Sequence, residues 1–214
     1  MILACVVLVI GYLVGSISFS NMVAMHFAHT NLLKFGSKNA GASNVGQLLG
    51  MKAMVIVGCV DVSKCAISVG ILRYVGVSTN YLVLLGCAVI AGHCWSCFLN
   101  FKGGRGVASL TGAILGLGWL DVFCASMSIA AVGVVIGNRP VFVALAVLAL
   151  PFTALIFDKD PLSLASLAAI VFVKRILGNT LIPESSDGLF RGYLRRLVFD
   201  RDIVSKVGWI RRGD

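Results

Sequence analysis

Stretches of apolar residues follow one another along almost the whole chain, and they restrict its fold more than any other feature. Of the 214 residues, 58% are hydrophobic and only 13% are charged, whereas soluble domains carry about 25% charged residues. Such a chain needs an apolar solvent for most of its surface, and the lipid bilayer provides one. The sequence therefore predicts an all-α integral membrane protein.

We expect about seven transmembrane helices, one for each apolar run. The runs cover approximately residues 1–22, 53–75, 81–98, 106–119, 122–137, 141–156 and 162–176. Several are shorter than the ~20 residues that usually cross a bilayer. Local thinning of the bilayer and close packing at glycine accommodate short spans.

The basic residues predict the orientation, because they fall on one side of this seven-span layout. That side contains Lys34, Lys38, Lys52, Lys102, Arg105, Arg139 and the C-terminal tail. Positive residues mark the cytoplasmic side, so we expect the N-terminus outside, the C-terminus in the cytoplasm, and a multi-pass protein of the bacterial plasma (inner) membrane. The first 20 residues lack the charged start of a signal peptide and are interpreted as the first span.

Two other classes of function fit the composition poorly. The net charge of +9 comes from residues in short gaps between apolar runs, not from a solvated basic face, so we expect no nucleic-acid partner. Cys94 and Cys97 beside His93 resemble half of a zinc site, but a closed site needs four ligands and no second half is visible. We therefore expect neither a metal nor another cofactor.

The first polar loop, residues 36–46, combines small residues with amide and hydroxyl groups. It contains Ser37, Lys38, Asn39 and Asn44. Backbone N–H groups in such a loop can approach an oxyanion closely. Serine and asparagine are equally common in turns and helix caps, so the loop alone leaves ligand binding and capping open.

The second polar loop is richer in glycine and leads into an apolar run. It reads Lys102-Gly103-Gly104-Arg105-Gly106, and His93 lies upstream. A glycine turn at the start of a helix is typical of phosphate binding, and the two cations would neutralise the anion. The loop lacks the spacing of a Walker A motif and follows no strand, which disfavours nucleotide binding.

Together, several separated blocks resemble the acyl-phosphate-dependent glycerol-3-phosphate acyltransferases, the PlsY family, over roughly the first 180 residues. The blocks are Gly15-Ser16-Ile17-Ser18-Phe19, the loop from Ser37 to Asn44, Asp61-Val62-Ser63-Lys64, Gly92-His93, and Phe101-Lys102-Gly103-Gly104-Arg105-Gly106. The resemblance implies seven helices with the N-terminus outside. We therefore expect a membrane domain over residues 1–180 and a basic cytoplasmic tail over residues 181–214, lying either on the anionic leaflet or in solvent.

The resemblance also implies a reaction of phospholipid biosynthesis. An acyl phosphate donates its acyl chain to glycerol 3-phosphate, giving 1-acylglycerol 3-phosphate (lysophosphatidate), and the expected partners are these two substrates and the lipid bilayer. By carry-over, His93 and Ser37 are the catalytic candidates, and Asp61 and Lys64, three residues apart on one helix, support them as an ion pair or by touching substrate. The substrate-binding candidates are Asn39, Asn44, Lys102, Gly103, Gly104, Arg105 and Gly106.

The chain departs from the family pattern at several positions. Arginine is expected at Gln47, proline at Ser96 and lysine at Arg105, and an ungapped comparison puts the expected serine, histidine and asparagine at Phe142, Ala169 and Phe172. A noncatalytic relative of the family and an anion-binding transporter or channel are therefore the alternatives to an enzyme. A transporter should have a polar path across the bilayer, whereas the polar motifs here gather toward one side, which favours the enzyme.

Overall fold

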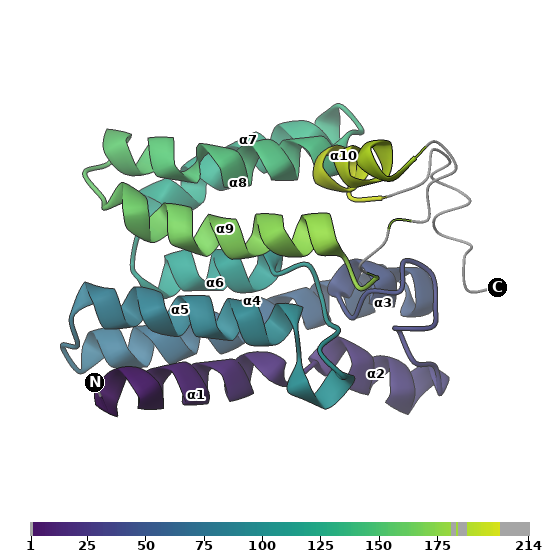
Figure 1. The fold of residues 1–214 in the computed structure, drawn as a ribbon, viewed down its shortest axis with the longest axis horizontal. Coiled ribbons are helices and arrows are strands. Elements are labelled where there is room, and N and C mark those ends of the chain that lie inside the picture. The colour runs from purple at the N-terminus through teal and green to yellow at the C-terminus, as the bar shows by residue number, and fades with distance from the viewer. Residues whose placement is uncertain (1, 181–182, 184–187, 202–214) are drawn as a thin grey trace.

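The computed structural model describes residues 2–180, 183 and 188–201, and these form a bundle of helices (Figure 1). The α-helices are α1 (Ile2–Ser16), α2 (Phe19–Ala28), α3 (Ala42–Leu49), α4 (Met51–Tyr74), α5 (Thr79–Cys94), α6 (Val107–Gly116), α7 (Leu120–Val135), α8 (Arg139–Ile156), α9 (Pro161–Leu177) and α10 (Leu189–Phe199). A 3-10 helix, η1 (Cys97–Leu99), follows α5. The all-helical prediction is confirmed for the described residues.

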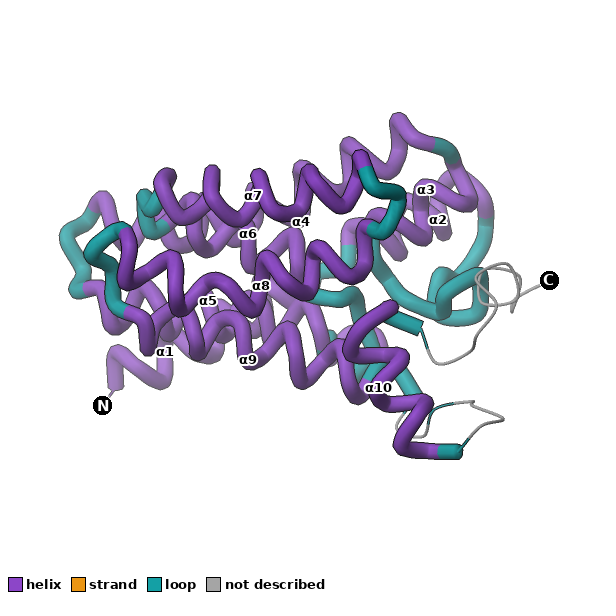
Figure 2. Tube along the Cα trace, turned by 90° about the horizontal axis from the view of Figure 1, so that it is seen from above, coloured by secondary structure: helices purple, strands orange, loops and turns teal. Residues whose placement is uncertain are grey.

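The long helices lie side by side, so their connections gather at two ends of the bundle (Figures 1 and 2). One end contains the N-terminus and the α4–α5, α6–α7 and α8–α9 turns, and the other contains α2, α3, the loop after α5, and α10. The basic loops predicted to share a side do share an end. Arg73, in the last turn of α4, lies at the opposite end and is an exception. The orientation of these ends across a membrane stays a prediction.

Three helical segments have the length and composition of membrane spans: 2–28, α4 and α8. α5, α6 and α7 are shorter apolar helices. The run predicted at 106–119 is helical over only 10 residues, or about 15 Å at 1.5 Å per residue, which is half of a ~30 Å hydrocarbon core. Glycines in the left-handed region, Gly106 and Gly118, flank this helix. The count of seven spans stays a prediction.

The first predicted span is broken in two, because α1 ends at Ser16 and α2 begins at Phe19. The side chain of Ser18 caps α2 by accepting from the Asn21 N–H. Lys64 of α4 donates to the carbonyl oxygens of Gly15 and Ile17, at 3.1 and 3.2 Å. A helix end leaves carbonyl groups without partners, so this lysine stabilises the break.

Close contacts at glycine hold α1 against α5 and so bring the break next to His93. A Cβ atom on Gly15 would collide with the Val89 carbonyl group, and one on Gly92 would collide with the Tyr12 carbonyl oxygen. Small residues at helix contacts let two backbones approach closely. Because Gly92 directly precedes His93, this contact fixes the histidine beside the ends of α1 and α5.

Candidate functional site

The loop after α5 folds back onto the end of that helix. Ser96 and Lys102 form an antiparallel bridge, and the Gly104 N–H donates to the His93 carbonyl oxygen at 3.0 Å. The Ser96 hydroxyl donates to the Ser16 carbonyl oxygen at 2.6 Å and also caps η1. The serine found where the family pattern has proline therefore fastens this loop to the break after α1.

Gly103 and Gly104 lie directly against His93. A Cβ atom on Gly103 would collide with the His93 carbonyl oxygen, and one on Gly104 would collide with Nε2 of the His93 ring. The Gly103 carbonyl oxygen also accepts from the Ala40 N–H at 3.2 Å. The two polar loops predicted from the sequence therefore meet at this glycine pair.

Asp61, Lys64 and His93 form a buried cluster beneath the glycine pair. Lys64 Nζ lies 3.1 Å from Asp61 Oδ1 and 3.1 Å from His93 Nδ1, while His93 Nδ1 lies 3.5 Å from Asp61 Oδ1. The structure thus contains the ion pair expected from the i, i+3 spacing. The Nδ1 atom of His93 faces this ion pair, and the Nε2 edge of its ring faces Gly104.

Asn179, two residues beyond α9, joins the loops to this helix. Its Nδ2 donates to the carbonyl oxygens of Lys38 and Gly103, both at 2.9 Å, and to Asn39 Oδ1 at 2.8 Å. Its Oδ1 accepts from the Gly103 N–H at 3.1 Å and from Lys174 Nζ at 2.7 Å. One amide therefore connects both loops with the last turn of α9.

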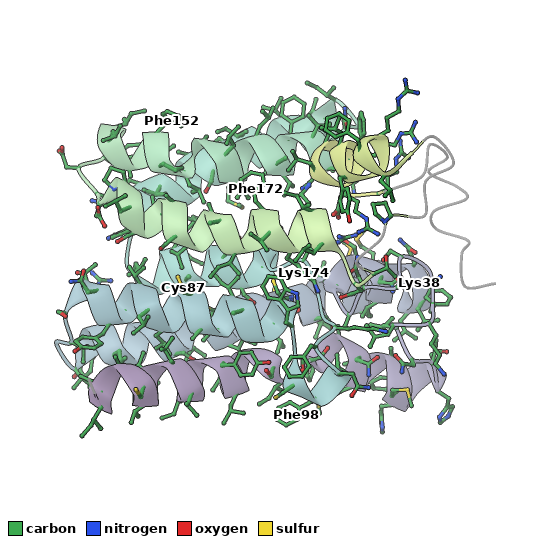
Figure 3. All side chains as sticks on the ribbon, in the orientation of Figure 1. Lys38, Cys87, Phe98, Phe152, Phe172 and Lys174 are labelled. Carbon is green, nitrogen blue, oxygen red and sulfur yellow. The ribbon has the colours of Figure 1, made fainter. Side chains whose placement is uncertain are left out.

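Two further cations surround this amide. Lys174 has no exposed surface, and its Nζ lies 5.2 Å from the centre of the Trp95 ring. Figure 3 places it at the end of α9, with Lys38 farther out at the same end of the bundle. The Asn39 amide lies between Asn179 and Arg105. Its oxygen accepts from Asn179 in one orientation; in the swapped orientation it accepts instead from Arg105 Nε at 2.7 Å and from Nη2 at 2.8 Å. Such buried cations attract anions strongly because little water screens them.

The amide of Asn44 holds the first loop together. Its Nδ2 donates to the carbonyl oxygens of Leu32, Phe35 and Asn39, and its Oδ1 accepts from the Ser37 N–H. These four contacts occupy its hydrogen-bonding atoms, so the described contacts give Asn44 a scaffolding role, and its predicted contact with substrate stays a prediction. The sequence left helix capping and ligand binding as alternatives for this loop. Helix α3 begins inside the loop, with Gly41 at its N-terminal cap position and no side-chain capping hydrogen bond.

Lys102 and Gly106 lie at the two edges of the second loop. The Lys102 side chain is exposed, and its backbone groups pair with Ser96 and Leu99. Gly106 has a φ angle of 81° and precedes the first residue of α6, where a Cβ atom would collide with Cys94 Sγ. The predicted glycine turn at a helix N-terminus is therefore confirmed.

Comparison with known proteins decides the family. Residues 5–180 match the model of a family described as glycerol-3-phosphate acyltransferase. The chain is 31% identical over 211 residues to glycerol-3-phosphate acyltransferase 4 of Dehalococcoides mccartyi, a match that covers 94% of this chain and 90% of that protein. It is 34% identical over 181 residues to glycerol-3-phosphate acyltransferase 2 of Bacillus anthracis, covering 81% of this chain and 95% of that protein. The chain belongs to the glycerol-3-phosphate acyltransferase family.

The fold agrees with this membership. The glycerol 3-phosphate form of PlsY, an integral membrane glycerol 3-phosphate acyltransferase, superposes with a TM-score of 0.72 and 25% sequence identity, covering 80% of this chain and 88% of that chain. The resemblance identified from the polar blocks is thus confirmed. The family match ends at residue 180, so α10 lies beyond it.

Several departures from the family pattern have a clear place in the structure. Gln47 is exposed on α3, and Phe142 of α8 packs against Gly133 of α7. Ala169 is exposed and Phe172 is packed against the core, and both lie inside α9. Asn179, which was not among the predicted site residues, supplies an amide beyond the end of this helix. The sequence signal was the pair Gly178-Asn179 directly after the apolar run, since glycine commonly ends a helix.

Proposed function

We propose that this protein transfers the acyl chain of an acyl phosphate to glycerol 3-phosphate, producing 1-acylglycerol 3-phosphate and inorganic phosphate. Family membership supports the acceptor, and the observation that carries the proposal is the grouping of Arg105, Lys174 and the Asn179 amide around the backbone of Gly103. Both substrates carry phosphate, and cations with converging N–H groups bind phosphate through charge-assisted hydrogen bonds.

The protein's part in this reaction is to position the two substrates, accept a proton and stabilise charge. The primary hydroxyl oxygen of glycerol 3-phosphate attacks the acyl carbonyl carbon, the bond from that carbon to the phosphate oxygen breaks, and phosphate leaves with the electron pair. In this step the neutral His93 carries its proton on Nδ1, which faces Asp61 Oδ1 at 3.5 Å, and accepts the hydroxyl proton at Nε2. Ser37 and Asn39 bind the substrate's hydroxyl or phosphate oxygens, while Lys102 and Arg105 stabilise the negative charge that develops on the leaving phosphate.

In this proposal the basic end of the bundle faces the cytoplasm of a bacterial inner membrane, and the acyl chain of the donor stays in the bilayer. A Lys102→Cys variant should react with a membrane-impermeant thiol reagent only after cells are opened, whereas an Asp158→Cys variant at the other end should react in intact cells. Both cysteines belong in a background from which the seven native cysteines have been removed. Reaction at position 102 from outside would reverse the orientation.

The activity test uses the purified, detergent-solubilised protein with acyl phosphate and labelled glycerol 3-phosphate, and measures labelled lysophosphatidate. Parallel reactions with acyl coenzyme A and acyl carrier protein identify the donor. Lys102→Ala should lower kcat/KM about ten- to a hundredfold, since one charge-assisted hydrogen bond is worth ~1.5–3 kcal/mol. Folded protein that gives no product with any donor would reject the proposal and leave a noncatalytic relative of the family.

A further inference from the structure

Helix α10 lies beside α9 at the basic end of the bundle (Figure 2). Two buried arginines, one from each side of the contact, dock it there. Arg196 of α10 donates from Nη1 to the carbonyl oxygens of Ile176, Leu177 and Thr180, and from Nη2 to the Thr180 hydroxyl. Ile176 and Leu177 are the last two residues of α9, and Thr180 follows the helix. A helix leaves its last carbonyl groups without partners. Arg196 therefore caps α9 from outside.

Arg175 of α9 makes the reciprocal contact. It donates to the carbonyl oxygens of Arg196 and Val198 near the end of α10, at 3.2 and 2.9 Å, and to the Pro140 carbonyl oxygen at 2.7 Å. Each helix thus caps the C-terminal end of the other. Charge-assisted hydrogen bonds in a buried contact fix geometry well, so these arginines hold the residue that directly follows α10 in place.

That residue is Asp200, and it lies against the second polar loop. Its Oδ1 is 3.1 Å from Arg105 Nε, and its carbonyl oxygen accepts from Arg105 Nη2 at 3.3 Å. Asn39 adjoins the same two nitrogens. Arg105 Nη1 is buried without a hydrogen-bond partner among the described residues. The carboxylate thus occupies part of the guanidinium and leaves other N–H donors unused.

We propose that Asp200 competes with the substrate's phosphate group for Arg105, so that the end of α10 must move aside when substrate binds. This inference rests on the proposed function of the glycine loop. A carboxylate and a phosphate use the same N–H donors of a guanidinium, and a carboxylate that stays beside the bound phosphate repels it. Phosphate has more acceptor oxygens and can also satisfy Nη1, which favours the exchange.

The proposed competition involves a residue outside residues 5–180, the part of the chain that matches the family model. It also gives the tail a role different from the one predicted for residues 181–214, which was to lie on the anionic leaflet or in solvent. In the structure, α10 packs on α8 and α9, and Asp200, the residue after the helix, reaches the second polar loop. Residues 202–214 lie outside the described part of the chain.

Asp200→Asn tests the competition in the full-length protein. The variant should lower the KM for glycerol 3-phosphate about two- to fivefold with kcat unchanged, because a partly exposed ion pair is worth ~0.4–1 kcal/mol. Asp158→Asn is the matched control: Asp158 also has a left-handed backbone, with a φ angle of 52° against 57° at Asp200, but it lies at the opposite end of the bundle. Its KM should equal that of the wild type.

Asp200→Asn should have no effect on KM in a protein that already has Arg105→Ala, because the Asp200 carboxylate then has no guanidinium to occupy. An unchanged KM in Asp200→Asn would overturn the proposal. A higher KM or a lower kcat would also overturn it, because either result would mean that Asp200 positions Arg105 for substrate.

A binding measurement separates this proposal from the proposed function. The thermal unfolding midpoint of the detergent-solubilised protein is recorded against inorganic phosphate, with sodium chloride matching the ionic strength. Asp200→Asn should reach its half-maximal shift at about two- to fivefold lower phosphate than the wild type and Asp158→Asn. Such a result supports the competition even if no acyl transfer is found, whereas equal midpoints in all three proteins refute it even if the enzyme is active.

Discussion

Replacing Asn179 with alanine should loosen the whole basic end of the bundle. The amide connects Lys38 and Asn39 of the first loop with Gly103 of the second loop and with Lys174 of α9. Alanine removes every one of these contacts without adding bulk. It also leaves the Lys174 ammonium, which has no exposed surface, with the face of Trp95 as its nearest described partner.

The expected loss follows from the number of hydrogen bonds that one amide can make. Its two N–H groups are shared among three acceptors, and its oxygen accepts twice, once from the charged Lys174. Three neutral bonds at ~1 kcal/mol and one charged bond at ~1.5 kcal/mol give an upper limit of ~4.5 kcal/mol. Asn179 is only half-buried, so water will replace part of this, and we expect a loss of ~2–3 kcal/mol in the free energy of unfolding.

The assay is chemical unfolding in detergent micelles followed by tryptophan fluorescence, together with steady-state acyl transfer. Asn138→Ala serves as the control, because Asn138 precedes α8 and its side chain makes no capping hydrogen bond. The KM for glycerol 3-phosphate should rise in Asn179→Ala only, since the orientation of the Gly103 N–H depends on this amide. If the two variants unfold alike and keep the same KM, then Asn179 does not join the loops.

The remaining predictions concern the buried cluster and the far end of the bundle. Gly104→Ala should lower the rate of acyl transfer at least about tenfold, because the added methyl group collides with the ring of His93. Gly70→Ala is the control and should not lower the rate, since the added atom meets nothing within 4 Å. Equal rates in the two variants would contradict the close approach of Gly104 to His93. Asp61→Asn and Lys64→Met should be coupled by ~1–3 kcal/mol in a double-mutant cycle that measures unfolding in detergent micelles. Lys64→Met should cost more stability than Asp61→Asn, because the carbonyl oxygens of Gly15 and Ile17 also lose their donor. Additive losses would show that the two charges act independently. The hydroxyl of Ser163, aided by two N–H groups, lowers the pKa of Asp160 below its ordinary value of 3.8. Its contribution to stability is therefore present above that value and is lost as the pH falls through the lower folded pKa. Asp160→Ala should be less stable than wild type near pH 7, and the difference between their unfolding midpoints should shrink as the pH falls below 3.8. A difference that stays constant with pH would refute this.

Hydropathy predicted the helices well because burial in lipid requires apolar residues along a whole helix. The position of every apolar run contains a helix, and charge predicted which connections share an end of the bundle. The break after Ser16 was not predictable in this way, because residues 17 and 18 interrupt neither the hydropathy nor the length of the run. The carbonyl groups freed there are satisfied by Lys64, 47 residues away from Ile17, and no local pattern reports such a partner.

The candidate site was predicted only where its residues form a local pattern in the sequence. Gly103 and Gly104 were found because glycine next to cations at the start of a helix is a local pattern, and His93 was found through the family resemblance. Asn179 contributes to the same site from 76 residues beyond Gly103, and it was not among the predicted site residues. Asp200 approaches Arg105 only because Arg175 and Arg196 dock α10 on the end of α9. Long-range contacts of polar side chains have no periodicity in the sequence.

The glycine pair is the point where the two polar networks of this protein meet. Gly104 touches the ring of His93, which belongs to the buried cluster with Asp61 and Lys64, and Gly103 is held on both of its peptide groups by Asn179. A phosphate bound at this backbone would therefore be adjacent both to a candidate base and to the cations around the amide. The absence of side chains at Gly103 and Gly104 thus has two consequences, close packing of the loop on His93 and close approach of an anion, and a substitution at either glycine changes both together.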